Sequence, residues 1–299
     1  METHHHEHNY QLTSLNKAFV IGIVLNVAFV IVEFSVGFYY NSLGLLSDAG
    51  HNLGDVASLV LAMLAFRLQR VSPNSRYTYG YKKSTVLVSL LNAVILLVAV
   101  GIIVVESIDK LFHPVAVDGS AIAWTAGVGV IINAVTAWLF LKDKEKDLNV
   151  KGAYLHMAAD TLVSVGVVVS GLVIAYTGWS IVDPIIGLMI AVIIVISTWG
   201  LLHDSLRLSL DGVPVGLDSQ KIVHLILEQP GVKSSHHVHI WALSTTETAL
   251  TAHLVINDIA KMEQVKCSVK MVLEQAGIHH ATLEIEDERT TCDTECCKD

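Results

Sequence analysis

The stretch SDAGHNLGD, residues 47–55, places ionisable side chains in the middle of an apolar run. On a helix, His51 and Asp55 lie four residues apart, so they project from one face with their Cβ atoms about 5–6 Å apart. The same spacing recurs at His156 and Asp160, in the sequence HMAAD, within a second apolar run. Two pairs of this kind supply two nitrogens and two oxygens, which is enough to form a tetrahedral site for a zinc-like ion.

Ionisable residues inside a bilayer are costly, about 2.5–3.5 kcal/mol each in insertion measurements, so they usually mark a transport path or have a buried partner. For a single histidine, a hydrogen bond between helices is the ordinary alternative to a metal ligand. The repeated pattern favours the ligand, because His51 and His156 alone among the fifteen histidines fall well inside the predicted spans. Asp48 either lines an exit path or holds a neighbouring helix, and we favour the structural role.

Six stretches are long enough to cross the hydrocarbon core of a membrane, which takes about 20 apolar residues. The hydrophobic content of 53% is typical of a chain that lies largely in a membrane. The predicted spans are Ala18–Tyr39, Leu43–Phe66, Ser84–Phe112, Ala121–Leu141, Gly152–Tyr176 and Ile181–Leu202. Asn26 is expected to hold two helices together, whereas Glu33 could carry a proton or pair with a neighbouring donor. Gly166 and Ser170 have the spacing of small residues at a close helix contact.

Lysine and arginine are concentrated in two of the five connections between spans. The second-to-third connection holds five of them and the fourth-to-fifth holds four, whereas on the opposite side there is only Lys110, near the end of the third predicted span. Because these residues stay on the cytoplasmic side, both termini are predicted to be cytoplasmic in a multi-pass plasma-membrane protein. The formal charge of -9 argues against a nucleic-acid partner, which would call for a basic face.

After Leu202 the composition changes, and the chain from Asp211 onward has the size of one small soluble core, about 80 residues. The predicted elements are a helix at Leu217–Gln229, strands at Val238–Leu243 and Thr248–Asn257, a helix at Ala260–Ala276 and a strand at Ala281–Glu286. Asp218 or Ser219 is expected to cap the first helix. This order of elements implies an open-faced α+β sandwich. The predicted divisions are a His-rich tail at 1–16, a six-helix transmembrane domain at 17–207, a cytosolic domain at 208–290 and a tail at 291–299.

Potential metal ligands are concentrated at the two predicted cytoplasmic ends. The first tail carries the sequence HHHEH, and eight of the fifteen histidines lie at or after the end of the sixth span. Cys292, Cys296 and Cys297 crowd the last eight residues, a spacing more natural for metal capture in a reducing compartment than for disulfides. Imidazole, carboxylate and thiolate are the ligands of zinc, so a second, cytosolic metal site is expected.

Six spans, cytoplasmic termini, two His-x-x-x-Asp motifs and a small α+β domain together resemble the cation diffusion facilitator family. The resemblance extends over Leu15–Asp287 and rests on SLGLLSDAGHNLGD, RYTYGYKK, HMAAD, VDPIIG, and HVHIW followed by TAHL. The chain is most similar to the bacterial branch that exports zinc, cadmium and cobalt. Two imidazoles favour these ions over manganese or iron, which suit an all-oxygen site.

The resemblance implies a homodimeric divalent-metal/proton antiporter in the membrane lipid of the bacterial inner membrane, not an enzyme, with a ferredoxin-like (αββαβ) cytosolic domain. Its transport ligands would be His51, Asp55, His156 and Asp160. A second zinc site, structural or regulatory, would use His236, His253 and Glu286 on three successive strands. Cys292, Cys296 or Cys297 would complete it, with or without a tail histidine such as the partner's His5. His237 and His239 adjoin His236, and the sequence does not decide which of the three points inward.

Zinc binding requires neutral imidazole and ionised carboxylate, so metal ions and protons compete for one site, and inward protons could drive zinc out. Two alternatives remain. A metal sensor without flux would need only the soluble ligands, and a membrane-embedded hydrolase would need a catalytic base that neither pair provides.

One observation opposes the four-ligand site: within the predicted limits of the spans, the two His-Asp pairs differ in depth in the membrane by roughly 12 Å. Tilt or an earlier start of the fifth span must close this gap.

Overall fold

The computed structural model describes residues 4–39, 43–113, 120–179 and 181–287. The chain divides into two compact units. The helical unit comprises residues 1–72 and 84–205, and the sheet unit comprises residues 73–83 and 206–299.

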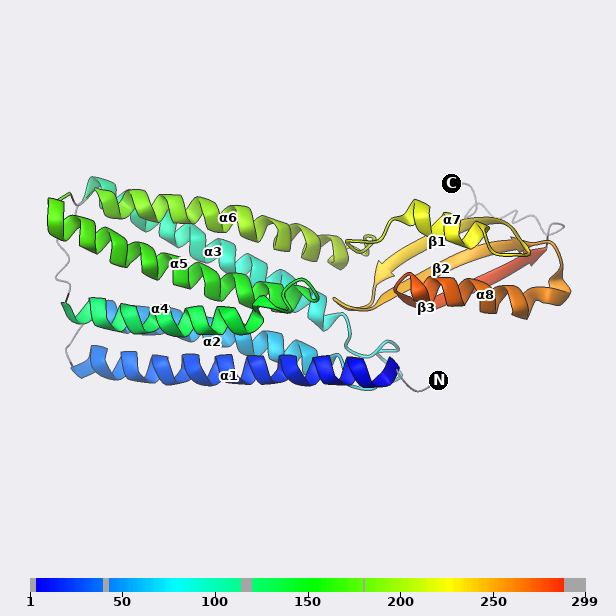
Figure 1. Ribbon diagram of the computed structural model, residues 1–299, viewed down its shortest axis with the longest axis horizontal. Coiled ribbons are helices and arrows are strands. Elements are labelled where there is room, and N and C mark those ends of the chain that lie inside the picture. The colour runs from blue at the N-terminus through cyan, green and yellow to red at the C-terminus, as the bar shows by residue number, and fades with distance from the viewer. Residues whose placement is uncertain (1–3, 40–42, 114–119, 180, 288–299) are drawn as a thin grey trace. The chain divides into compact units, whose positions relative to one another are not determined.

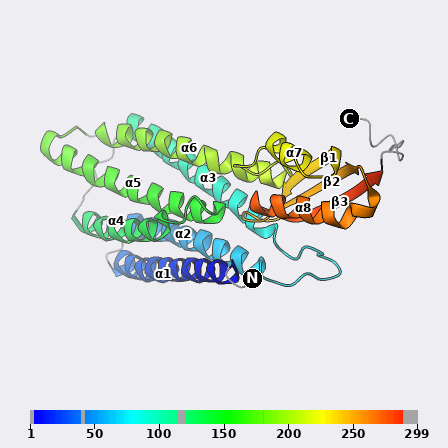
Figure 2. The same cartoon turned by 45° about the vertical axis from the view of Figure 1, so that its right-hand side comes forward.

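Long helices lying side by side make up the described part of the helical unit (Figures 1 and 2). Their bounds are α1 His4–Tyr39, α2 Leu43–Leu68, α3 Ser84–Phe112, α4 Ser120–Leu141, α5 Leu148–Thr177 and α6 Val182–Ser209, whose last residues belong to the sheet unit. Each predicted span corresponds to one of these helices. The first helix begins well before the predicted span, so part of the His-rich tail is helical.

Three runs within the described helices are both long enough and apolar enough to cross a bilayer: Lys17–Val36, Ser84–Phe112 and Pro184–Ser209. Gly127–Leu141, in α4, is apolar but shorter. In an 18-residue apolar window of each of the three long runs, only 28% of the residues are buried, so most of the apolar residues there are at least partly exposed. An outward-facing apolar surface of this extent is what a lipid environment requires.

Aromatic and aliphatic side chains join α1, α2, α4 and α5 into one core. The Phe19 ring lies 4.8 Å from the Phe140 ring and 5.6 Å from the Phe66 ring, centroid to centroid. Gly166 on α5 is buried, and a Cβ added there would lie 2.3 Å from Ile190 Cδ1 of α6. The predicted close contact at Gly166 is therefore confirmed, while the Ser170 side chain lies outside the described residues.

The sheet unit contains two helices, one short 3-10 helix and a three-stranded sheet within its described residues. The bounds are α7 Ser219–Leu227, β1 Val232–Ala242, β2 Thr248–Ile256, η1 Ile259–Lys261, α8 Met262–Gln275 and β3 Ile278–Asp287. The strand β2 lies in the middle, antiparallel to β1 and parallel to β3 (Figure 1). The two helices and the sheet share one apolar core. The predicted element order is found.

The ends of these elements follow from local chemistry. Asp218 is the N-cap of α7, where its side chain accepts hydrogen bonds from the backbone N–H groups of Gln220 and Lys221. The first strand begins at Val232, six residues before the predicted Val238. The prediction was too short because a β-bulge after His236 interrupts the alternation of side chains that marks a strand in sequence.

Candidate metal sites

A buried cluster of Asp55, His156 and Asp160 joins α2 to α5; we call it the helix-pair site. Asp55 is 1% exposed and His156 is 5% exposed. His156 Nε2 lies 2.6 Å from Asp55 Oδ1 and 3.8 Å from Asp160 Oδ2. One ligand atom from each of the three residues lies within 4.8 Å of the others, a spacing that fits a single metal ion.

The contact between Asp55 and His156 shows that the predicted depth difference of about 12 Å is wrong. Asp147 caps α5, since its Oδ1 accepts hydrogen bonds from the backbone N–H groups of Asn149 (2.7 Å) and Val150 (3.3 Å). The helix therefore begins at Leu148, four residues before the predicted start.

The fourth predicted ligand, His51, lies on the described backbone of α2, but its side chain lies outside the described residues. Its position four residues before Asp55 puts it on the same face of that helix. The side chain of Asp48 is likewise outside the described residues.

A second pair of buried polar residues adjoins the motif. Asn52 Nδ2 donates a hydrogen bond to Glu33 Oε2 of α1 at 2.7 Å, and both side chains are buried. Glu33 thus has a neighbouring donor, one of the two roles that the sequence left open for it. Asn52 was not predicted as that donor, although an asparagine within an apolar helix commonly bonds to a neighbouring helix. Asn26 bonds to Thr136 Oγ1 of α4 at 3.2 Å, so its predicted role between helices is confirmed.

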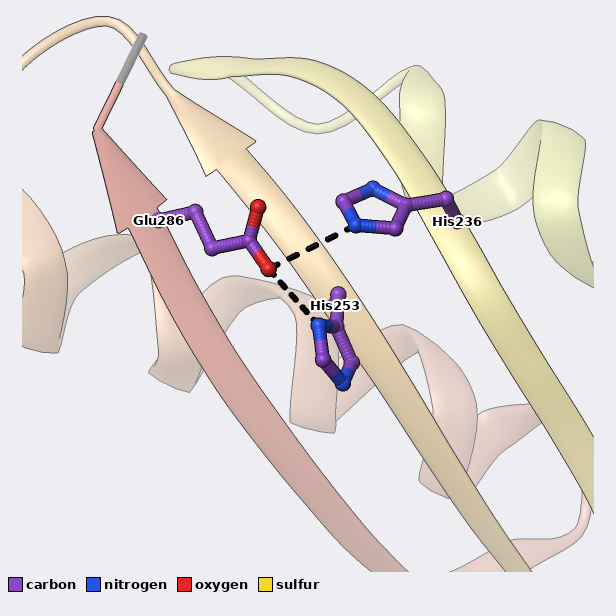
Figure 3. Close-up of side chains that lie close together, drawn as sticks. All are labelled: His236, His253 and Glu286. Carbon is purple, nitrogen blue, oxygen red and sulfur yellow. Dashed lines mark hydrogen bonds and ion pairs between the residues drawn. The ribbon is translucent and has the colours of Figure 1, made fainter. Parts of the chain in front are cut away.

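Three residues from three strands form a cluster in the sheet unit, which we call the sheet site. Glu286 Oε1 on β3 lies 2.6 Å from His253 Nδ1 on β2 and 3.4 Å from His236 Nε2 on β1 (Figure 3). His236 and His253 are directly paired in the sheet register. One ligand atom from each lies within 4.8 Å of the others. Their side chains are 12% to 35% exposed, so this cluster is open to water.

The sheet register explains why these three side chains meet. On β3, Glu284 is paired with His253, and Glu286 lies two residues further along the same face. Glu284 Oε2 is 3.4 Å from His253 Nε2, a neighbour that the sequence analysis did not single out. Cys292, Cys296 and Cys297 lie outside the described residues. Cys267 is an exposed free thiol on α8.

Both clusters combine imidazole nitrogen with carboxylate oxygen, the ligands that zinc and similar divalent ions accept. The helix-pair site supplies one nitrogen ligand and two carboxylates from described side chains, and the sheet site supplies two nitrogen ligands and one carboxylate. The residues present therefore fit a divalent metal ion at each place.

Comparisons with known proteins cover both units. A family model described as the cation efflux transmembrane domain matches residues 19–208. A second model, ZT_dimer, the cytoplasmic domain of cation efflux proteins, matches residues 214–288.

Curated relatives match nearly the whole chain. The "Cadmium, cobalt and zinc/H(+)-K(+) antiporter" of Bacillus velezensis is 34% identical over 286 residues, which is 94% of this chain and 91% of that protein. The "Zinc transporter ZitB" of Escherichia coli is 35% identical over 88% of this chain and 84% of that protein. The "Metal cation efflux system protein CzcD" of Cupriavidus metallidurans is 34% identical over 90% of this chain and 86% of that protein. Among solved structures, the metal-bound C-terminal domain of a CzcD transporter is 37% identical, covering 23% of this chain and 99% of that domain, with a TM-score of 0.22.

Proposed function

The chain belongs to the cation efflux family, and from this premise we propose that it exports zinc, and also cadmium and cobalt, in exchange for protons. As a member of this family, it is a membrane transporter for divalent metal efflux and not an enzyme. The relatives named as zinc transporters or as cadmium, cobalt and zinc antiporters support the choice of ions. Two histidines at the motif positions point the same way, because imidazole favours these ions over manganese.

One observation carries the proposed mechanism: the 2.6 Å contact between His156 and Asp55 inside the helical unit. We assign the transport site to His51, Asp55, His156 and Asp160. With neutral imidazoles and ionised carboxylates, these four ligands carry a formal charge of -2, which a divalent cation cancels. Without the metal, proton uptake relieves the charge, because an uncompensated charge at this burial is strongly unfavourable. Competition between protons and metal for the same atoms couples their opposite movements.

The remaining features of the proposal follow from the loop charges and the family. We assign six membrane spans, α1 to α6, with both termini in the cytoplasm and the protein in a bacterial inner membrane. The sheet unit is a cytoplasmic domain of ferredoxin-like αββαβ order, and it supports a homodimer, in line with the dimer domain of its family. The sheet site binds zinc as a structural or regulatory ligand.

The test is zinc flux into proteoliposomes that contain a fluorescent zinc indicator, measured with and without an opposing proton gradient. Wild-type flux should follow the gradient, and Asp160→Ala should reduce it to the level of protein-free vesicles. Asp109→Ala is the matched control, because Asp109 is an exposed carboxylate on α3 that pairs with His113. Tight zinc binding without flux in the wild type would instead favour a sensor. Equal flux in Asp160→Ala and in the control would reject the assigned ligands.

A further inference from the structure

The backbone of β1 has a left-handed residue beside the sheet site. His237 has a φ of 47°, a backbone conformation that residues other than glycine rarely adopt. It lies in a β-bulge, because His236 pairs with His253 and His239 pairs with Thr251. An advance of three residues along β1 therefore matches two residues along β2. Bulges with a left-handed residue usually have glycine there. A strained residue that the fold retains is a reason to ask what its side chain does.

The bulge changes which side chains are neighbours. In a regular strand, His237 would point to the opposite face of the sheet from His236. Instead, its ring centroid is 5.5 Å from that of His236 and 5.3 Å from that of His253. The His236 and His253 centroids are 5.2 Å apart. Three imidazoles thus form a nearly equilateral triangle next to Glu286.

The size of this triangle matches a metal site. Three imidazoles on one tetrahedral zinc ion, at about 2.0–2.1 Å from nitrogen to metal, have ring centres about 5.2 Å apart. The three observed separations are between 5.2 and 5.5 Å. The cluster of ligand atoms within 4.8 Å of one another contains His236, His253 and Glu286 but not His237, so His237 has to rotate its ring to bring a nitrogen to the ion. The ring centroid of His239, in contrast, is 6.2 Å from that of His237, and its side chain is exposed.

We propose that His237 is the fourth ligand of the sheet site, so that His236, His237, His253 and Glu286 hold one zinc-like cation within a single chain. The proposal rests on the sheet site assigned above and not on metal flux. It removes the need for Cys292, Cys296 or Cys297, or for the partner's His5, to complete the coordination. The left-handed backbone at His237 is then the means by which two adjacent histidines serve one ion.

The experiment is a zinc titration of the full-length protein in detergent, in an Asp160→Ala background that removes a ligand of the transport site. His237→Gly and His237→Asn both suit a left-handed backbone, so the fold is kept while the imidazole is lost. We expect the Kd for zinc at the sheet site to rise at least about tenfold in both variants, because substitution of even the residues that support metal ligands weakens metal binding by about that factor. His239→Asn is the matched control and should leave the Kd unchanged. An unchanged Kd in His237→Gly and His237→Asn would overturn the proposal.

Two further readouts separate the possible failures. The cobalt-loaded protein should show no sulfur-to-cobalt charge-transfer band, and replacement of the three terminal cysteines by serine should leave zinc binding unchanged. A sulfur band that vanishes in the serine variant would mean that thiolates complete the site instead of His237. His253→Ala tests the sheet site itself: if it binds zinc as tightly as the background protein, the site and the proposal both fail. Flux of the wild-type protein is measured separately and bears only on the helix-pair site.

Discussion

The helix-pair site and the sheet site contain the same ligand types in different surroundings. The side chains of Asp55 and His156 are 2% and 6% exposed, whereas those of His253 and His236 are 25% and 35% exposed. In a buried site a charge interacts strongly with its neighbours and is costly when it loses its partner. In an open site, water replaces the lost partner and screens the charge. Burial, more than the choice of ligand, therefore sets what each site contributes.

This difference suggests two uses of a metal ion. A buried cluster that must always be neutralised, by metal or by protons, is suited to exchanging one for the other. A partly exposed cluster on a sheet can stay empty at little cost, which is suited to sensing or to structural stabilisation. If this contrast is right, substitutions in the buried cluster will change zinc flux far more than substitutions in the exposed one.

The contrast fails if the buried carboxylate is dispensable. Asp55→Asn keeps the shape of the side chain but removes the charge and weakens its ability to bind metal. Substitution of residues that hydrogen-bond to metal ligands lowers metal affinity by about 10–100-fold. Loss of a ligand itself should therefore lower zinc flux by at least that factor. Flux into proteoliposomes is the measurement, with Asp109→Asn on an exposed carboxylate of α3 as the control. Flux within twofold of the wild type would remove Asp55 from the transport site.

The packing that holds α5 beside α6 gives the next effect. Gly166→Val places a side chain where even a Cβ would lie 2.3 Å from Ile190 Cδ1. Overpacking of this kind costs about 1–3 kcal/mol, so the thermal midpoint in detergent should fall. Gly101→Val is the matched control, because a Cβ there meets no atom within 4 Å. Equal midpoints for the two variants would show that α5 and α6 separate easily.

The pair formed by Glu33 and Asn52 distinguishes a structural role from a proton carrier. Glu33→Leu leaves the Asn52 side chain without this acceptor, and a buried unsatisfied group costs about 1–3 kcal/mol. Glu33→Gln retains a carbonyl oxygen that can accept the bond, so it should be more stable than Glu33→Leu and should keep most of the flux. Thermal unfolding and flux are measured on the same preparations. A stable Glu33→Gln protein without flux would make Glu33 a proton carrier instead.

The smallest effect on flux should come from the sheet site. His253→Ala removes the residue whose two ring nitrogens face Glu286 and Glu284. Zinc bound per chain at equilibrium should fall by one ion, while flux at saturating zinc changes by less than about threefold, roughly 0.7 kcal/mol. Equilibrium dialysis and the vesicle assay give the two numbers. If flux falls as far as in Asp55→Asn, the two sites do not differ in role and the contrast is wrong.

Several features were accessible from the sequence because they depend on local periodicity. Each predicted span corresponds to a long helix, and the two-strand, helix, strand order of the sheet unit is as predicted. The spacing of Asp55, His156 and Asp160 identified residues that the structure brings together. Helical spacing and the length of an apolar run depend on residues close together in the sequence, so they can be predicted from the sequence alone.

Other features depend on residues far apart in the sequence, and only the tertiary structure decided them. The depth count failed because it relied on the predicted limits of the two spans, whereas α5 begins four residues earlier and packing brings His156 against Asp55. The sequence could not decide which of His236, His237 and His239 points toward the sheet site, since the bulge that changes the alternation of side chains on β1 arises from its pairing with β2. The sequence by itself determined the helices, the motifs and the family resemblance. The register and the packing decided which candidate ligands lie together, because those contacts lie between segments and not within them.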